Sequence, residues 1–430
     1  MAAAAHGAAL SRVLRLSRQV WVRAAAFTAI AVAVALAAGL VGPLAPVDIR
    51  VELGQNSVES LLQIIATAML TATTFSITAM VTAYSSATTT ATPRSTQLLI
   101  TDPTSQNALS TFVGAFVFSL VGIIALSTDY YTEQGRTILF VGTLVVIAIV
   151  VVTLLRWIAH LARFGRMADV IDRVEQAPTR SLLAYASSPT LGARRLGHAP
   201  ADAVAVWAES TGYVAHIDVA ALDRVGRGRD IEVVVAATPG TIADDRSPLA
   251  LLSGSALRDD DVRVDAADAV RGAFRLAPHR DYEQDPRLGV IALTEIGSRA
   301  LSPATNDPGT AIEVIAALQR VFTEALRTDR DPRVEFEHVS IAPPRLSDLV
   351  SDSFQPLARD DAGILEVQIR LQKCLAALAA TAPHERETFA RAAADAQRRA
   401  RGAMDGSDRR VLRREAADAW RSARSIRTSR

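Results

Sequence analysis

Long runs of apolar residues alternate with polar stretches through the first third of the chain. Four such runs, at about residues 20–41, 61–83, 108–126 and 137–155, contain almost no charged side chains. As helices rising about 1.5 Å per residue, each is long enough to cross a hydrocarbon core of about 30 Å. A cleaved signal peptide is the alternative for the first run, but its length and the three further runs favour a retained anchor. The pattern therefore predicts a transmembrane domain of four helices over residues 1–158.

Arginines flank the outer ends of this predicted domain. Those before or at the start of the first span are Arg12, Arg15, Arg18 and Arg23, and those after the fourth are Arg156, Arg163 and Arg166. Positive residues near membrane helices favour the cytoplasmic side. We therefore expect a multi-pass protein of the bacterial plasma (inner) membrane, with the lipid bilayer as its surroundings and both termini in the cytoplasm.

The second span carries polar side chains at steps of three or four residues, which is the spacing of a single helix face. This hydroxyl face consists of Gln63, Thr67, Thr71, Thr74, Thr78, Thr82, Ser85 and Thr89. Over about 39 Å of helix it is longer than the hydrocarbon core is thick. The interiors of the four spans contain no Asp, Glu, His or Lys, which argues against a proton-coupled transporter.

Three environments suit the hydroxyl face. Against lipid, each hydroxyl bonds the carbonyl four residues earlier. Against other helices, small and hydroxylated residues allow close packing, and against water they line a neutral pore. Four spans without an evident inverted repeat predict that any conduction needs a homo-oligomer. Arg94, next to the helix-ending Pro93, is the candidate cytoplasmic mouth, either as an anion-attracting ring or as an ordinary positive-inside anchor.

The rest of the chain, residues 159–430, is mixed in polarity and predicts a cytoplasmic α+β region. Residues 159–198 read as an amphipathic helical stalk that continues the fourth span. Short Val- and Ile-rich runs separated by Gly, Pro and Asp predict a small β-module over residues 199–280. Its glycines and prolines resemble the barrel-sandwich pattern of lipoyl and biotinyl carriers, without a lysine to modify. Residues 281–430 predict a mainly helical domain with one added strand at 334–341.

Asp-Pro pairs mark predicted helix starts, because Asp caps a helix and Pro suits its first turn. The pair at Asp307 and Pro308 follows a short loop, and the free amides of the first helical turn form a modest anion site. Structural capping and anion binding both fit this turn. Its candidate residues are Ser302, Asn306, Asp307 and Thr310.

Composition excludes several activities. The 430 residues include 45 acidic and 46 basic side chains, a net charge of +1 that gives no case for a nucleic-acid partner. The single lysine, Lys373, lies in a Leu-Gln-Lys-Cys sequence, so a P-loop is absent. The single cysteine, Cys374, and the scattered histidines predict no metal site. Without a catalytic constellation, we expect no enzyme and no cofactor.

Three blocks of sequence resemble a bacterial family of predicted membrane proteins catalogued as domain of unknown function twenty-two fifty-four. The most specific block is Leu-Ser-Pro-x-x-Asn-Asp-Pro at residues 301–308, preceded by Asp-Pro-Arg-Leu-Gly at 285–289. The others are Thr-Pro-Arg at 92–94 and Ser-Thr-Gly-Tyr-Val at 210–214. Where the family usually has a Gly-Asp-Phe-Val-like turn, this chain has Pro-Gly-Thr-Ile at 239–242. The resemblance covers roughly residues 15–420 and implies the topology, not an activity.

Two functions follow from these patterns. The first is a homo-oligomeric channel-like protein, in which the second helix lines the path and the cytoplasmic domain gates or assembles it. The alternative is a non-conducting, membrane-anchored sensor or scaffold whose cytoplasmic domain binds a ligand or partner. The sequence identifies neither the ion nor the small ligand.

Overall fold

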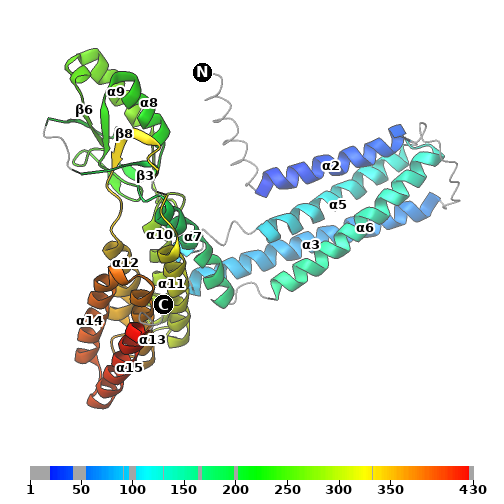
Figure 1. Cartoon of the computed structure of the whole chain (residues 1–430). Coiled ribbons are helices and arrows are strands. Elements are labelled where there is room, and N and C mark those ends of the chain that lie inside the picture. The colour runs from blue at the N-terminus through cyan, green and yellow to red at the C-terminus, as the bar shows by residue number, and fades with distance from the viewer. Residues whose placement is uncertain are drawn as a thin grey trace. The chain divides into compact units, whose positions relative to one another are not determined.

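The computed structural model describes residues 20–41, 55–90, 92–95, 103–128, 130–162, 167–197, 202–331 and 333–425 (Figure 1). The chain divides into two compact units. The first unit is Met1–Thr89 with Thr96–Asp169, and the second is Thr90–Ser95 with Val170–Arg430. Each unit has its own buried core and is described by itself.

The described part of the first unit contains four helices. They are α2 (Val20–Val41), α3 (Gln55–Thr90), α5 (Pro103–Ser127) and α6 (Glu133–Leu161). Within the described residues, three stretches are long and apolar enough to cross a membrane, namely Ser57–Thr82, Thr104–Ser127 and Gln134–Leu161. The expected first span is helical over Val20–Val41. Within its described residues, however, only the stretch Ala25–Ala37 forms an apolar helix, and it is shorter than the three candidate spans. The structure therefore supports three candidate spans, and the fourth crossing stays a prediction.

Helix α5 supplies the centre of this unit. Its Phe118 is buried with Leu62 of α3 and Leu139 of α6, while Phe112 is buried with Met69 of α3 and Trp157 of α6. Gly122 of α5 leaves room for Leu62, because a Cβ at Gly122 would lie 3.0 Å from a Leu62 methyl carbon. Small residues that allow helices to approach closely are typical of membrane helix packing.

Strands of the second unit form two sheets. The larger has the order β1 (Ala193–Arg195), β8 (Phe336–Ile341), β4 (Glu232–Val235), β6 (Ala250–Ser253), β2 (Val204–Val206), and the smaller has the order β5 (Ile242–Ala243), β3 (Gly212–Ile217), β7 (Phe274–Ala277). In the larger sheet β8 runs parallel to β1 and β4, whereas β6 pairs antiparallel with β4 and β2. The added strand predicted at 334–341 therefore lies inside the sheet of the β-module.

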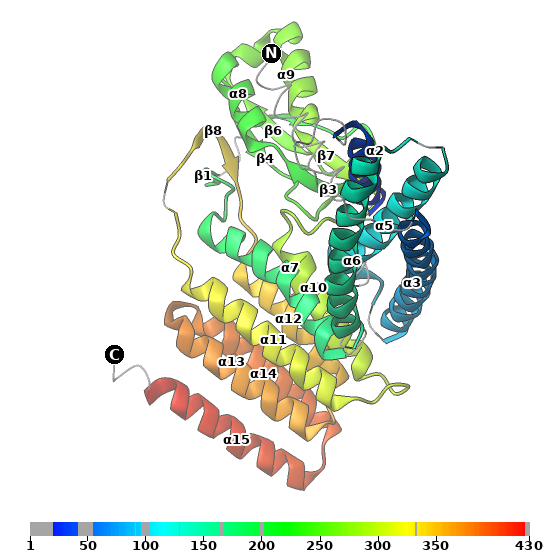
Figure 2. The same ribbon diagram turned by 90° about the vertical axis from the view of Figure 1, so that its right-hand side faces the viewer.

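Two helices make this module α/β instead of the expected barrel-sandwich. They are α8 (Val219–Arg229) and α9 (Asp260–Gly272), and their apolar sides join the sheet core through Leu222 and Val270. Figure 2 shows both helices packed beside the strands. The barrel-sandwich is not confirmed, because two stretches that were expected to connect strands form the capped helices α8 and α9. Asp218 caps α8, and Asp259 caps α9.

The remaining helices stack in layers (Figure 2). They are α7 (Met167–Ser187), α10 (Pro286–Ala300), α11 (Pro308–Arg327), α12 (Leu346–Asp360), α13 (Leu365–Thr381), α14 (Arg386–Ala403) and α15 (Gly406–Ser425). The helices predicted from Pro286 and Pro308 are confirmed. Four described helices follow residue 345, in the region predicted to be mainly helical.

The predicted stalk is wrong in one respect. Helix α6 ends at Leu161, and α7 is a separate helix whose apolar face is buried from Val170 to Leu182. Its Pro178 lies so close to Gly289 of α10 that a Cβ at Gly289 would be 2.6 Å from the Pro178 Cα atom. Glu175 of α7 also accepts a 2.8 Å hydrogen bond from Arg320 Nε of α11. The amphipathic pattern therefore reflects packing in a helical bundle.

Candidate functional site

The hydroxyl face of α3 is open in the single chain. Every member from Gln63 to Ser85 has an exposed side chain, and the Thr89 side chain lies outside the described residues. The hydroxyls of Thr67, Thr71, Thr74, Thr78 and Thr82 each donate to the carbonyl four residues earlier, at 2.9–3.0 Å. Because the hydroxyl hydrogens point back to the helix, the outward groups are oxygen lone pairs.

A groove of about 880 Å³ runs between this face and α6. Its α3 side includes Gln63, Thr67 and Thr71, and its α6 side includes Leu154 and Leu161. Because Ile64 and Phe75 of α3 also line it, the groove is mainly apolar, with the polar groups of Gln63, Thr67 and Thr71 along its α3 side. The hydroxyl face does not pack into the core of the described first unit, which is formed by other residues of α3 such as Leu62 and Met69.

The short segment Thr90–Ser95, which begins at the last residue of α3, belongs to the second unit. We call Thr92–Ser95 the clip, because Thr92 and Ser95 are buried there and bond each other. Thr92 N donates to Ser95 Oγ at 2.9 Å, and Ser95 Oγ donates to the Thr92 carbonyl at 2.8 Å. Tyr282 Oη donates to the Arg94 carbonyl at 3.0 Å. The Arg94 guanidinium forms an ion pair with Glu295 of α10.

This pairing changes the interpretation of Arg94. A ring of free arginines at a channel mouth would attract anions, but here a carboxylate accompanies the guanidinium. Because both side chains are partly exposed, at 47% and 34%, the pair contributes little to stability, of the order of 1 kcal/mol or less. Its role is positional, since it holds the clip against α10.

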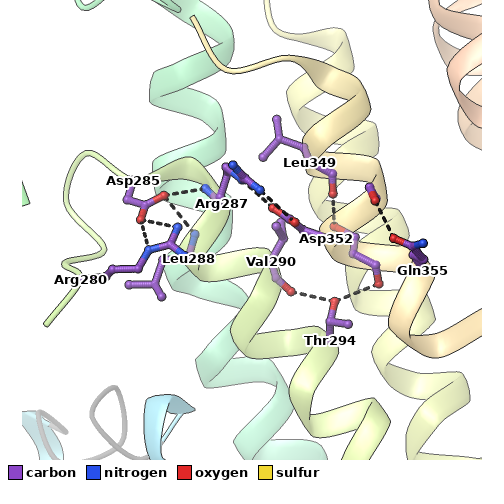
Figure 3. Close-up of polar contacts among 11 residues, drawn as sticks. Arg280, Asp285, Arg287, Leu288, Val290, Thr294, Leu349, Asp352 and Gln355 are labelled. Carbon is purple, nitrogen blue, oxygen red and sulfur yellow. Dashed lines mark hydrogen bonds and ion pairs between the residues drawn. The ribbon is translucent and has the colours of Figure 1, made fainter. Parts of the chain in front are cut away.

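Asp285 at the start of α10 is the most buried charged group of this region, with 1% of its surface exposed (Figure 3). Its Oδ1 accepts from the amides of Arg287 and Leu288 at 3.0 and 3.2 Å, which caps the helix. Its Oδ2 accepts from Arg280 Nε at 2.7 Å. Burial raises the pKa of Asp285 above its ordinary value, although Arg280 opposes that shift.

A glycine lets the β-module meet this carboxylate. Gly240 has φ of +86°, and a Cβ built there would lie 2.3 Å from Asp285 Oδ2. The glycine of the Pro-Gly-Thr-Ile turn is therefore required by both conformation and space. Nearby, Gln284 accepts from the Ile217 amide at 2.8 Å and donates to the Ile217 carbonyl at 3.2 Å. The β-module therefore contacts the segment at the start of α10 at two points, at Gly240 beside Asp285 and at Ile217 with Gln284.

Helix α10 is also bound to α12. Arg287 donates from Nε and Nη2 to the two carboxylate oxygens of Asp352, at 2.6 and 3.0 Å (Figure 3). Donation of these hydrogen bonds to Asp352 raises the pKa of Arg287. Further along α10, Thr294 donates to the carbonyl of Ser353, the residue after Asp352, at 2.9 Å. Bidentate arginine–carboxylate pairs fix geometry as well as charge.

The candidate turn between α10 and α11 is a cap. Asp307 Oδ1 accepts from the Thr310 amide at 3.0 Å, and Oδ2 accepts from the Thr310 hydroxyl at 2.6 Å. These bonds hold the pKa of Asp307 below its ordinary value. Asn306 has φ of +46°, and Ser302 Oγ donates to Thr305 at 3.3 Å. Asp307 occupies the amides that an anion would need, which favours the capping role.

The structure gathers separate sequence motifs along α10. The clip reaches its Glu295, Asp285 caps its start, and the Ser302–Asp307 turn follows its end. The hydroxyl face lies in the other unit. Sequence reasoning missed Arg280, Tyr282 and Asp352, whose partners are distant along the chain or carry no motif. Among the described residues no group of three or more His, Cys, Asp or Glu could hold a metal ion.

Comparison with known proteins gives a family and distant relatives. The chain matches a family described as predicted membrane protein (DUF2254) over residues 17–377. An uncharacterized protein of Mycobacterium bovis is 27% identical over 244 residues, which is 53% of this chain and 44% of the relative. An uncharacterized protein of Mycobacterium tuberculosis is 26% identical over 238 residues, with the same coverage of 53% and 44%. The match thus spans less than half the length of these relatives. No solved structure gives a significant match.

Proposed function

This chain belongs to the DUF2254 family of predicted membrane proteins, and we propose that it is a homo-oligomeric, channel-like protein of the bacterial plasma membrane. Helix α3 lines the path, and the second unit gates or assembles the oligomer from the cytoplasm. The observation that carries this proposal is the hydroxyl face, which is exposed from Gln63 to Ser85 in the isolated chain. The hydroxyl donors of this face are satisfied by helix carbonyls, so lipid is tolerated, but its exposed oxygen acceptors and the Gln63 amide are better matched by a partner helix or by water.

A second copy provides that environment. Around a symmetry axis, the hydroxyl faces of several copies would meet each other instead of lipid. Their hydrogens are bound to helix carbonyls, so the path presents oxygen lone pairs, as ion-conducting pores do for cations. Because Arg94 is paired with Glu295, its charge no longer favours the conduction of anions. We therefore infer a path for water or small cations.

The clip connects α3 to the second unit through the chain. Residues 90–95 belong to the second unit although α3 begins in the first, so we infer that the clip transmits movement of α10 along the chain to α3. Tyr282 and Glu295 are the contacts that transmit it. Gating would then depend on side chains far from the path, as in other rigid-body transitions.

Flux through liposomes tests the proposal. Purified protein is expected to release K⁺ from loaded vesicles, and Thr74→Ile with Thr78→Ile is expected to lower that flux at least about tenfold, because two isoleucines would dewet the path. Thr153→Ile places the same change on α6, outside the hydroxyl face, as the matched control.

If vesicles containing the wild-type protein showed no flux, the channel proposal would be wrong. A flux unchanged by the double substitution would remove α3 from the path. With no flux, the scaffold alternative gains support if the full-length protein captures a defined ligand or partner.

A further inference from the structure

A polar cavity lies in the second unit, apart from the hydroxyl face and from the contacts of α10 described above. It has a volume of about 370 Å³ and lies among the end of α7, the β1 strand and the start of α12. This size falls within the range of small-molecule pockets. The side chains that matter for its chemistry are Tyr185, Arg195, Arg330, Arg345, Ser347 and Thr388.

Three arginines line this cavity without carboxylate partners. Within the described ranges, Arg195, Arg330 and Arg345 form no ion pair, whereas Arg280, Arg287 and Arg320 each hold a carboxylate. Glu385 also lines the cavity and accepts a 3.5 Å hydrogen bond from Thr388 Oγ1, so three arginines face one carboxylate there. In a chain with 45 acidic and 46 basic residues, three unpaired arginines at one cavity are an excess of positive charge that invites an anion.

The backbone around the cavity is rigid. Two prolines, Pro343 and Pro344, precede Arg345, which stands at the N-cap of α12 without a side-chain cap hydrogen bond. Tyr185 Oη donates to the Pro344 carbonyl at 2.6 Å and holds this segment against α7. The positive end of the 15-residue α12 dipole adds to the arginine charge, although Asp348 in its first turn offsets part of it.

Nearby charges act on the ring of Tyr185. Burial raises its pKa, while Arg330 and Arg195 lower it and Glu385 and Asp348 raise it. Both arginines therefore lie near the buried ring from different segments of the chain. The three guanidinium groups come from β1, from the loop after α11 and from the start of α12, so only the folded unit brings them together.

We propose that this cavity binds the phosphate group of a phosphorylated ligand. Guanidinium groups recognise phosphate in a bidentate manner, and three of them match the terminal oxygens of a phosphate monoester. Ser347 supplies a hydroxyl donor at the same cavity. The phosphate is borne either by a soluble metabolite or by a lipid headgroup, and both sources present the same chemistry.

Calorimetric titration of the full-length protein in nanodiscs tests the site. In phosphatidylcholine discs, glycerol phosphate and inorganic phosphate are the soluble probes, and discs containing phosphatidic acid provide the lipid arm. We expect each of Arg195→Gln, Arg330→Gln and Arg345→Gln to weaken binding of the responding probe about tenfold, and the triple variant to abolish it.

Charge-matched controls separate this site from general electrostatics. The control variant combines Arg399→Gln, Arg401→Gln and Arg410→Gln, which removes three exposed arginines from α14 and α15. It should leave binding unchanged. The buried Cys374 thiol should resist alkylation in every variant, which shows that the fold is retained. Binding of soluble probes indicates a metabolite, and a response confined to phosphatidic acid indicates a headgroup. Equal binding by the triple variant and the wild type, or no response to any probe, would overturn the proposal.

Discussion

Replacement of Asp285 by alanine is expected to destabilise the second unit by about 3–5 kcal/mol, the usual cost of removing one partner of a buried ion pair. Arg280, whose side chain is 19% exposed, would lose its carboxylate, and the amides of Arg287 and Leu288 would lose their cap. The midpoint of urea unfolding of the purified protein, followed by Cys374 labelling, measures the loss.

Two variants divide this effect into its causes. Asp307 also caps an Asp-Pro helix, but it is exposed and bonds only within its own turn, so Asp307→Ala should cost about 0.5–2 kcal/mol. Asp285→Asn keeps a capping oxygen without the charge and should fall between these values. Equal losses for Asp285→Ala and Asp307→Ala would show that the buried pair with Arg280 contributes nothing.

Asp361→Asn is expected to stabilise the second unit at pH 8 and to leave it nearly unchanged at pH 4. Asp361 is fully buried at the corner between α12 and α13, and burial raises its pKa from 3.8 to about 7. Gln368 Nε2 donates to its Oδ1 at 2.6 Å. Within the described chain Asp361 Oδ2 and Gln368 Oε1 have no hydrogen-bond partner, which suits a protonated carboxyl.

The direction of the pH dependence follows from linkage. A carboxyl whose folded pKa exceeds its unfolded pKa contributes stability below about pH 4, and that stability is lost as the pH rises to about 7. The shift corresponds to about 4 kcal/mol, so the asparagine should recover about 2–4 kcal/mol at pH 8.

Unfolding midpoints between pH 4 and pH 8 check this prediction. Asp360→Asn is the control, because Asp360 is the neighbouring carboxylate and bonds Arg359 at 2.7 Å instead of the core. It should keep most of the pH dependence. A wild-type midpoint that does not fall between pH 4 and pH 7 would show that Asp361 is not forced into its neutral form.

Local patterns predicted much of the second unit. Short Val- and Ile-rich runs predicted β2, β3, β4 and β6, and Asp-Pro pairs predicted the starts of α10 and α11, because each signal lies within one element. Helices α8 and α9 were missed, since short Ala-, Asp- and Arg-rich stretches between strands have weak periodicity. Their existence depends on packing against the sheet through residues such as Leu222 and Val270.

Long-range partners could not be predicted. Arg94 and Glu295 are 201 positions apart, and Tyr282 is 188 positions from the Arg94 carbonyl that it bonds. Nothing in either local sequence marks these partners, so Arg94 was read as a mouth residue from its charge alone. The stalk was misread for a related reason, because an amphipathic face does not reveal whether it packs in a bundle or extends from a membrane.

Cysteine cross-linking at Thr74 tests the central claim most directly, which is that hydroxyl faces of neighbouring copies meet. The single native cysteine, Cys374, is buried and gives little background. In membranes treated with copper phenanthroline, Thr74→Cys should form disulfide-linked dimers, whereas Val145→Cys, at an exposed position on α6, should stay monomeric. Cross-links at Val145→Cys and none at Thr74→Cys would contradict the account, because the hydroxyl face would then be turned away from neighbouring copies.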